Sequence, residues 1–151
     1  MSPANRKVLK AAKGRVDDLD RAIDAIRAGG DPNARDEYNL TAFIWCARKG
    51  HVAVAQVLRA AGADIEARDN MRRTAIHHAV LFRRLEFIDY LLSIGADITA
   101  TEMHDCSALD LALYEVGLPR VDPQIVARLT AAGAPAPQHP EHNHATAGNA
   151  S

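Results

Sequence analysis

A cluster of possible metal ligands lies near the carboxyl end of the chain. It comprises three imidazoles and one carboxylate: His139, Glu141, His142 and His144. Imidazole is a common ligand of zinc, copper and nickel, and a flexible chain can wrap around an ion. No cysteine accompanies the histidines, and their spacing implies no fixed geometry. Two interpretations stay open, a metal-handling tail and a solvated tail with adventitious affinity. We adopt the second and expect no resident metal or cofactor.

The other possible reactive group is a thiol. Cys106 follows His104 and Asp105 directly, and an imidazole beside a thiol can activate it as a nucleophile. However, the segment is predicted to be a turn tip, with no oxyanion stabiliser and no closed pocket. The chain also lacks a phosphate-binding glycine motif, a Gly-x-Ser-x-Gly elbow, paired-cysteine zinc spacing and His-Glu-x-x-His. We therefore predict no enzymatic activity, and we expect Cys46 and Cys106 to be free thiols.

The elements that must position these groups follow a 33-residue step. Three sets of residues recur at that interval: Gly29, Gly62 and Gly95; Asp36, Asp69 and Glu102; and Thr41, Thr74 and Ser107. Thr41 is a typical N-cap, because its hydroxyl can accept a hydrogen bond from the first helical turn. Gly50 then separates two apolar helical patterns, and Gly62 is a typical C-terminal stop. Each helix pair is too short to bury its apolar face alone, so neighbouring units must stack.

This unit resembles the ankyrin repeat, a β-turn followed by two antiparallel helices. The Thr-Ala-apolar start, the Gly50-His51 turn and the Gly-Ala-Asp-Ile exit fall in register together over residues 5 to 135. The resemblance implies an all-α solenoid of about four stacked repeats. We expect a domain of residues 1–134, divided into repeats 5–35, 36–68, 69–101 and 102–134, and a disordered tail of residues 135–151.

Two histidines stand out against the family pattern. The family's Thr-Pro-Leu-His start has no proline here, which favours looser helix starts, and His77 is the only histidine in its expected place. We expect the His77 side chain to form hydrogen bonds within its own repeat. His78 occupies the position of Trp45 and Leu111, which the family places in the core, so we predict a packed neutral imidazole. Residues 117–123 are interpreted as a lengthened loop between the helices of the last repeat.

The resemblance also implies where a partner protein binds. In ankyrin-like stacks the partner usually meets the concave side, which is built from the turn tips and the exposed end of each first helix. Carried over to this chain, the positions are Glu37, Tyr38, Leu40, Arg48 and Lys49, then Asn70, Met71, Arg73, Leu81 and Phe82, then Met103, His104, Cys106, Tyr114 and Glu115.

These positions hold many aromatic, methionine and leucine side chains, although the whole chain is only 5% aromatic. Interface cores are enriched in aromatic residues, methionine and arginine, and an exposed apolar strip marks a binding site. We interpret the strip as a partner-binding surface that owes nothing to the core. An alternative stays open for Leu81 and Phe82, which could instead turn inward at Arg83-Arg84.

Composition limits the kinds of partner and the cellular compartments that we expect. The 18 basic and 19 acidic residues provide no positive excess for a phosphate backbone, so we expect no nucleic acid partner. No apolar run is long enough to span a membrane. We expect a cytoplasmic, monomeric protein, and the abundance of arginine and alanine favours a bacterial source. The predicted function is a protein–protein interaction module, such as an adaptor, an inhibitor or an immunity-type partner. The alternative is metal handling by the histidine tail.

Overall fold

The computed structural model describes residues 1–114 and 122–137, and in these residues the protein is helical. The helices are α1 (Pro3–Lys13), α2 (Leu19–Arg27), α3 (Ala42–Lys49), α4 (Val52–Ala60), α5 (Ala75–Leu81), α6 (Leu85–Ser93), α7 (Ala108–Tyr114) and α8 (Pro123–Ala131). Only two isolated β-bridges, Arg35 to Thr41 and Thr101 to Ser107, occur in the described part. The predicted all-α solenoid is confirmed.

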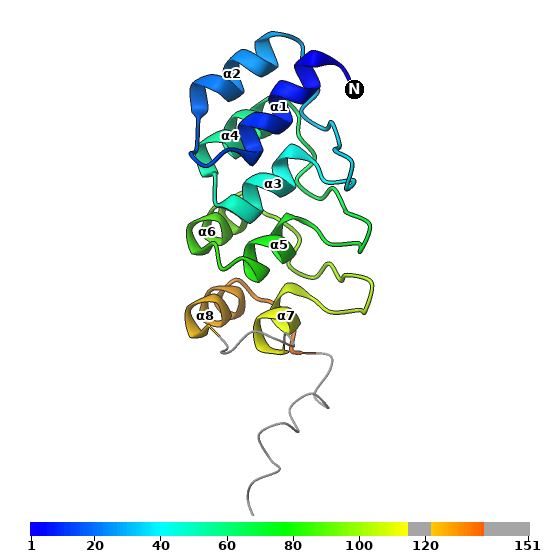
Figure 1. The fold of residues 1–151 in the computed structure, drawn as a ribbon. Helices are drawn as coiled ribbons and strands as arrows, with labels where there is room; N and C mark the ends of the chain where they lie inside the picture. The colour runs from blue at the N-terminus through cyan, green and yellow to red at the C-terminus, as the bar shows by residue number, and fades with distance from the viewer. Residues whose placement is uncertain (115–121, 138–151) are drawn as a thin grey trace, which may run out of the picture.

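The helices form two rows of a single stack (Figure 1). One row holds α1, α3, α5 and α7, the first helix of each pair, and the other holds α2, α4, α6 and α8. The long loops that join successive pairs project together beside the first row. We call the surface formed by these loops and the exposed side of the first helices the turn face. No helix of the described residues is long and apolar enough to cross a membrane.

The core lies between the two rows, and aromatic and small residues share it. Phe43 of α3 and Phe87 of α6 are almost fully buried, and their ring centroids lie 5.9 Å apart in an edge-on arrangement. Such pairs contribute about 0.5 to 1.5 kcal/mol beyond the area that they bury. Ala47 and Ala55 are completely buried, and their small size lets neighbouring helices approach closely.

The starts of α3, α5 and α7, the first helices of their repeats, are capped from within the same repeat, as the 33-residue register predicts. The Thr41 hydroxyl accepts a hydrogen bond from the Ile44 amide at 3.2 Å. In the next repeat, His77 Nδ1 accepts from the Thr74 amide at 3.1 Å, so the predicted hydrogen bonding of His77 within its own repeat is confirmed. In the last repeat a carboxylate replaces the imidazole, since Asp110 Oδ2 accepts from the Ser107 amide at 2.8 Å.

Neighbouring repeats complete one another's polar groups. The Asp17 carboxylate, from the first repeat, accepts hydrogen bonds from the amides of Ala53 and Val54, each at 2.8 Å. These amides belong to the first turn of α4 and have no partner within that helix. His51 Nε2 lies 2.8 Å from the Gly14 carbonyl oxygen. The second repeat therefore depends on the first for the start of its second helix.

The turn tips require a backbone conformation that disfavours most side chains. Asn39, Arg72 and Asp105 have φ of 61°, 61° and 59°, and they are again spaced by 33 residues. For a residue other than glycine, this left-handed region costs about 1 to 2 kcal/mol. Asparagine and aspartate tolerate it better than arginine does, so Arg72 is the most strained of the three tips.

Arg72→Gly is expected to stabilise the protein. Removing the Cβ relieves the left-handed strain, and the greater entropy of glycine in the unfolded chain offsets part of that gain. We expect a net gain of about 0.5 to 1 kcal/mol, or a rise of about 3 °C in Tm, by circular dichroism melting. Gly50→Ala is the opposite control, because at φ 81° its Cβ would lie 3.3 Å from Arg84 Cδ. An unchanged or lower Tm for the Arg72 variant would contradict the strain argument.

Candidate functional site

An acidic side chain closes each turn of the turn face. Asp36 Oδ1 accepts hydrogen bonds from the amides of Tyr38 and Leu40 at 2.9 and 3.0 Å. Asp69 Oδ1 accepts from the amides two and four residues further on at 2.8 and 2.9 Å, and Glu102 Oε1 does so at 2.7 and 3.4 Å. Burial alone would raise the pKa of all three carboxyls, but the hydrogen bonds that they accept outweigh it and lower the pKa.

The second carboxylate oxygen ties two of the turns to a first helix. Asp36 Oδ2 accepts from Trp45 Nε1 at 2.7 Å and also meets Lys13 Nζ at 2.7 Å. One repeat later, Asp69 Oδ2 lies 2.9 Å from His78 Nε2. His78 is 3% exposed, which matches the predicted packing, but the sequence reasoning missed its partner. The available signal was that Asp36 and Trp45 have the same spacing as Asp69 and His78, and both rings carry N–H groups.

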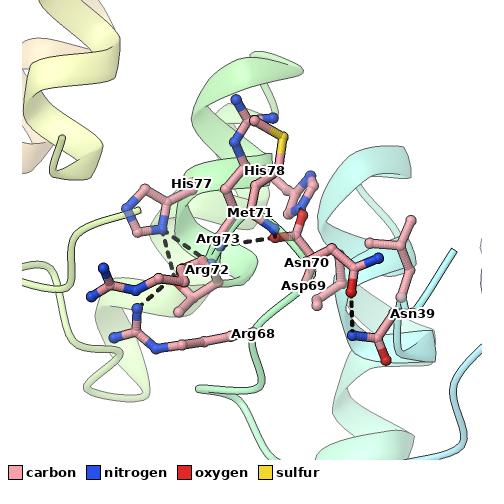
Figure 2. Close-up of polar contacts among 12 residues, drawn as sticks. Asn39, Arg68, Asp69, Asn70, Met71, Arg72, Arg73, His77 and His78 are labelled. Atoms are coloured by element: carbon pink, nitrogen blue, oxygen red, sulfur yellow. Dashed lines mark hydrogen bonds and ion pairs between the residues drawn. The ribbon is translucent and has the colours of Figure 1, made fainter. Parts of the chain in front are cut away.

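Two arginines fasten successive turns to each other. Arg35 Nη1 donates to the carbonyls of Asn39 and Arg68, each at 2.8 Å. Arg68 Nη1 repeats the pattern with the carbonyls of Arg72 and Thr101 at 3.1 and 2.9 Å. Figure 2 shows Arg68 beside the backbone of Arg72. These contacts hold the turn tips in a fixed row, so side chains from different repeats keep constant relative positions.

The turn face contains an open hollow of about 380 Å³ between the turns of the second and third repeats. Six of its lining residues belong to the predicted partner-binding set: Tyr38, Leu40, Arg48, Asn70, Met71 and Arg73. The other three, Trp45, Asp69 and His78, were not predicted. Across its outer edge, Asn39 Nδ2 donates to Asn70 Oδ1 at 2.8 Å (Figure 2). The hollow is thus built by two repeats together.

A stacked arginine lies beside this hollow. The Arg48 guanidinium carbon is 4.6 Å from the ring centroid of Trp45 and 4.6 Å from that of Phe82. A cation over an aromatic face gains about 0.5 to 2 kcal/mol, and the two rings together restrict where the guanidinium can point. Phe82 keeps 41% of its surface exposed, so it does not turn into the core. Leu81 is half-buried.

The remaining predicted residues occupy different environments. Tyr38 and Met103 are 64% and 50% exposed, and Glu37, Lys49 and His104 are exposed as well. The prediction that these positions owe nothing to the core is wrong for Leu40, which is only 5% exposed. Leu40 contributes to the core as well as to the wall of the hollow. Tyr114 ends α7, but its side chain and all of Glu115 lie outside the described residues.

The structure provides no support for a reactive thiol. Both cysteines are free, Cys46 being buried and Cys106 half-buried, as predicted. Burial raises the pKa of Cys46 well above its usual value. For Cys106, burial raises the pKa as well, and the nearby carboxylates of Glu102 and Asp110 raise it further. Both thiols are therefore held in the protonated form, which is a poor nucleophile.

Metal binding cannot be assigned to the described part of the chain. No group of three or more histidine, cysteine, aspartate or glutamate side chains in residues 1–114 and 122–137 is arranged to hold an ion. The predicted alternative site consists of His139, Glu141, His142 and His144, and these lie outside the described residues.

Comparison with known proteins places the chain among repeat proteins. Residues 9–102 match the family described as ankyrin repeats, in three copies. The chain is 30% identical over 115 residues to "Protein glp-1" of Caenorhabditis elegans. This alignment covers 73% of this chain and 9% of that protein. It is 32% identical over 66 residues to "Putative ankyrin repeat protein FPV244" of Fowlpox virus (strain NVSL), covering 44% of this chain and 10% of that protein.

A third relative is "Putative palmitoyltransferase ZDHHC13" of Danio rerio, which is 28% identical over 88 residues. That match covers 58% of this chain and 13% of the relative. The chain therefore spans only about a tenth of the length of these relatives. In each case the aligned segment lies within the repeat stack and is a small part of the relative.

Proposed function

We propose that this chain, which belongs to the ankyrin-repeat family, binds another protein on its turn face as an adaptor, an inhibitor or an immunity-type partner. Ankyrin repeats form protein–protein interaction modules, and the family is generally not enzymatic. The observation that carries the proposal is the hollow, where the exposed Tyr38 of one repeat and the half-buried Met71 of the next meet two arginines. Neither arginine forms an ion pair with a carboxylate of the described residues. The concave position and the regulatory role go beyond what membership of the family implies.

The exposed rings are the most useful part of this surface for binding. Tyr38 and Phe82 keep 64% and 41% of their surface in solvent, although neither is needed to fill the core. Aromatic anchors bury a large area on binding and lose little rotamer entropy, so they dominate many interfaces. Tyr38 lies in a fastened turn, and Phe82 packs against Arg48. Both rings are thus restrained before binding, which reduces the entropy lost in the complex.

Tyr38→Ala and Phe82→Ala are each expected to weaken partner binding about thirtyfold, which corresponds to about 2 kcal/mol. Stability should fall by no more than about 1 kcal/mol, because both side chains are largely exposed. The measurement is calorimetric titration of the partner captured from cells, together with thermal melting of each variant. Leu19→Ala is the matched control, because Leu19 is 42% exposed at the start of α2, in the other row of helices.

The result distinguishes the proposed surface from others. Constant affinity in the Tyr38 and Phe82 variants, or an equal loss in the Leu19 variant, would show that the partner binds elsewhere. Unfolding of both variants would show that these rings belong to the core, contrary to their exposure.

The predicted monomeric state and cytoplasmic location are parts of the same proposal. Two free thiols, one of them buried, are consistent with a reducing compartment. Sedimentation equilibrium of the purified chain is expected to give a single monomeric mass, and cell fractionation should place the protein in the cytoplasmic fraction. A concentration-dependent dimer would contradict the predicted monomeric state.

A further inference from the structure

Two arginines of the hollow have no acidic partner among the described residues. Arg48 and Arg73 both line it, and neither forms an ion pair with a carboxylate of residues 1–114 or 122–137. The Nε atom of each is buried and has no hydrogen-bond partner in the described part of the chain. A buried donor without an acceptor costs about 1 to 3 kcal/mol, and a charged group costs more. A negative group against either half-buried arginine would offset part of this cost.

Three basic side chains on the turn face already have contacts of their own. Lys13 contacts the Asp36 carboxylate at 2.7 Å, while Arg35 and Arg68 donate to backbone carbonyls. Arg48 and Arg73 are the two cationic side chains that line the hollow itself.

The acid in the lining is not paired with these arginines. Both oxygens of Asp69 are occupied, Oδ1 by the amides of Met71 and Arg73 and Oδ2 by His78. The lining thus holds two guanidinium cations and one carboxylate, and that carboxylate is bonded to other groups. Its electrostatic complement is a negative group supplied from outside.

The same hollow has an apolar side. Leu40 and Met71 lie in its wall, together with the rings of Tyr38 and Trp45. Arg48 is held between the rings of Trp45 and Phe82, so its guanidinium is oriented before a ligand arrives. A planar guanidinium fixed in this way matches the two oxygens of a carboxylate.

We propose that the hollow receives an aspartate or glutamate side chain from an acidic segment of the partner protein, with an adjacent apolar side chain against Leu40 and Met71. This inference rests on the proposed function, since it names the chemistry of the partner at the same face. A nucleic acid fits less well, because its binding requires many free cations, whereas the arginines that join the turns are already bound to carbonyls.

The test uses displayed random peptides as the probe, selected against the full chain. Enriched sequences are expected to contain aspartate or glutamate next to leucine, isoleucine, methionine or phenylalanine. For a synthetic copy of the best peptide, changing the acid to its amide should weaken binding about tenfold or more by fluorescence polarisation. Raising the ionic strength should weaken binding as well. Enrichment of basic or uncharged peptides, or of none, would overturn the proposal.

Matched variants locate the contact. Arg48→Gln and Arg73→Gln should each weaken the acidic peptide about tenfold or more, whereas Arg27→Gln, at an exposed arginine of α2, should leave its affinity unchanged. Thermal melting of each variant shows that it folds. Arg73→Glu provides an independent test, because it should accept a peptide in which lysine replaces the acid. Equal affinities in all arginine variants would overturn the assignment.

Two further outcomes separate this inference from the proposed function. If the selected peptides lose affinity with Tyr38→Ala but need no acid, the turn face binds proteins and the carboxylate inference fails. If Tyr38→Ala and Phe82→Ala leave every selected peptide unaffected, the proposed function itself fails. Saturable binding of a labelled single-stranded or duplex oligonucleotide that depends on Arg48 and Arg73 would replace the acidic protein segment with a nucleic acid.

Discussion

Asp69→Ala is expected to lower the free energy of unfolding by about 3 kcal/mol, a large part of the stability of a chain of this size. The change removes two backbone hydrogen bonds to Oδ1 and the contact of Oδ2 with His78 Nε2. Hydrogen bonds to a charged group contribute about 1.5 to 3 kcal/mol each. His78 Nδ1 already lacks a hydrogen-bond partner among the residues that the structure describes, so the variant would bury an imidazole with neither nitrogen bonded to them. Urea unfolding followed by circular dichroism measures the loss.

A matched aspartate isolates the effect of burial. Asp89→Ala removes the ion pair with Arg128 Nε, which has a shorter distance of 2.7 Å but lies on the surface. Exposed pairs contribute about 0 to 1 kcal/mol, so this variant should remain close to the wild type. Asp69→Asn should fall between the two, because its amide oxygen can still accept from the turn amides. If Asp69→Ala lost no more than Asp89→Ala, the turn carboxylates would not be structural.

Acidification from pH 6.5 to pH 4 is expected to cost about 3 kcal/mol of stability through His77 alone. Burial lowers the pKa of His77 to about 4 and outweighs the nearby carbonyls of Cys106 and Ala100, which raise it. The imidazole must also stay unprotonated at Nδ1 to accept from the Thr74 amide. Since the unfolded pKa is about 6.5, the unfolded chain binds more protons at this imidazole than the folded chain does within this window, so stability falls as the pH falls.

His77 affects stability only within a limited pH range. The contribution of His77 is fully present above pH 6.5, declines as the pH falls, and is lost near pH 4, where the folded protein is protonated too. The carboxyls of Asp36, Asp69 and Glu102 have lowered pKa values, so their stabilisation is lost only at pH values below about 4.5. As the pH falls, the loss of stability through His77 therefore begins before the loss through the three carboxyls.

Urea unfolding at a series of pH values measures how steeply the free energy of unfolding changes with pH. His77→Gln should abolish most of it between pH 6.5 and 4, because glutamine at this helix position can also accept from the N-cap amide and does not titrate. His104→Gln is the control, since His104 is exposed and lies in a turn. An unchanged slope in the His77 variant, or an equal reduction in the His104 variant, would assign the acid sensitivity to another group.

The sequence by itself determined the repeat register and the places where helices begin and end. Thr41, Thr74 and Ser107 take part in the caps of their helices, and Gly50 adopts the left-handed conformation at φ 81°. These features are local, because they depend on backbone angles and on partners three or four residues away. A local pattern that repeats three times also predicts the stack, since no single pair of helices can bury its apolar face.

The tertiary structure alone decided which side chains form the candidate site. Arg48 meets Phe82 across a repeat boundary, and the hollow joins the turns of two repeats. Leu40 was predicted to be exposed like Tyr38, but its side chain is buried. Its amide donates a hydrogen bond to Asp36 within the same turn. Whether neighbouring turn residues face solvent or core depends on the spacing and rotation between stacked units. A linear pattern specifies that units stack, whereas packing in three dimensions sets their mutual positions.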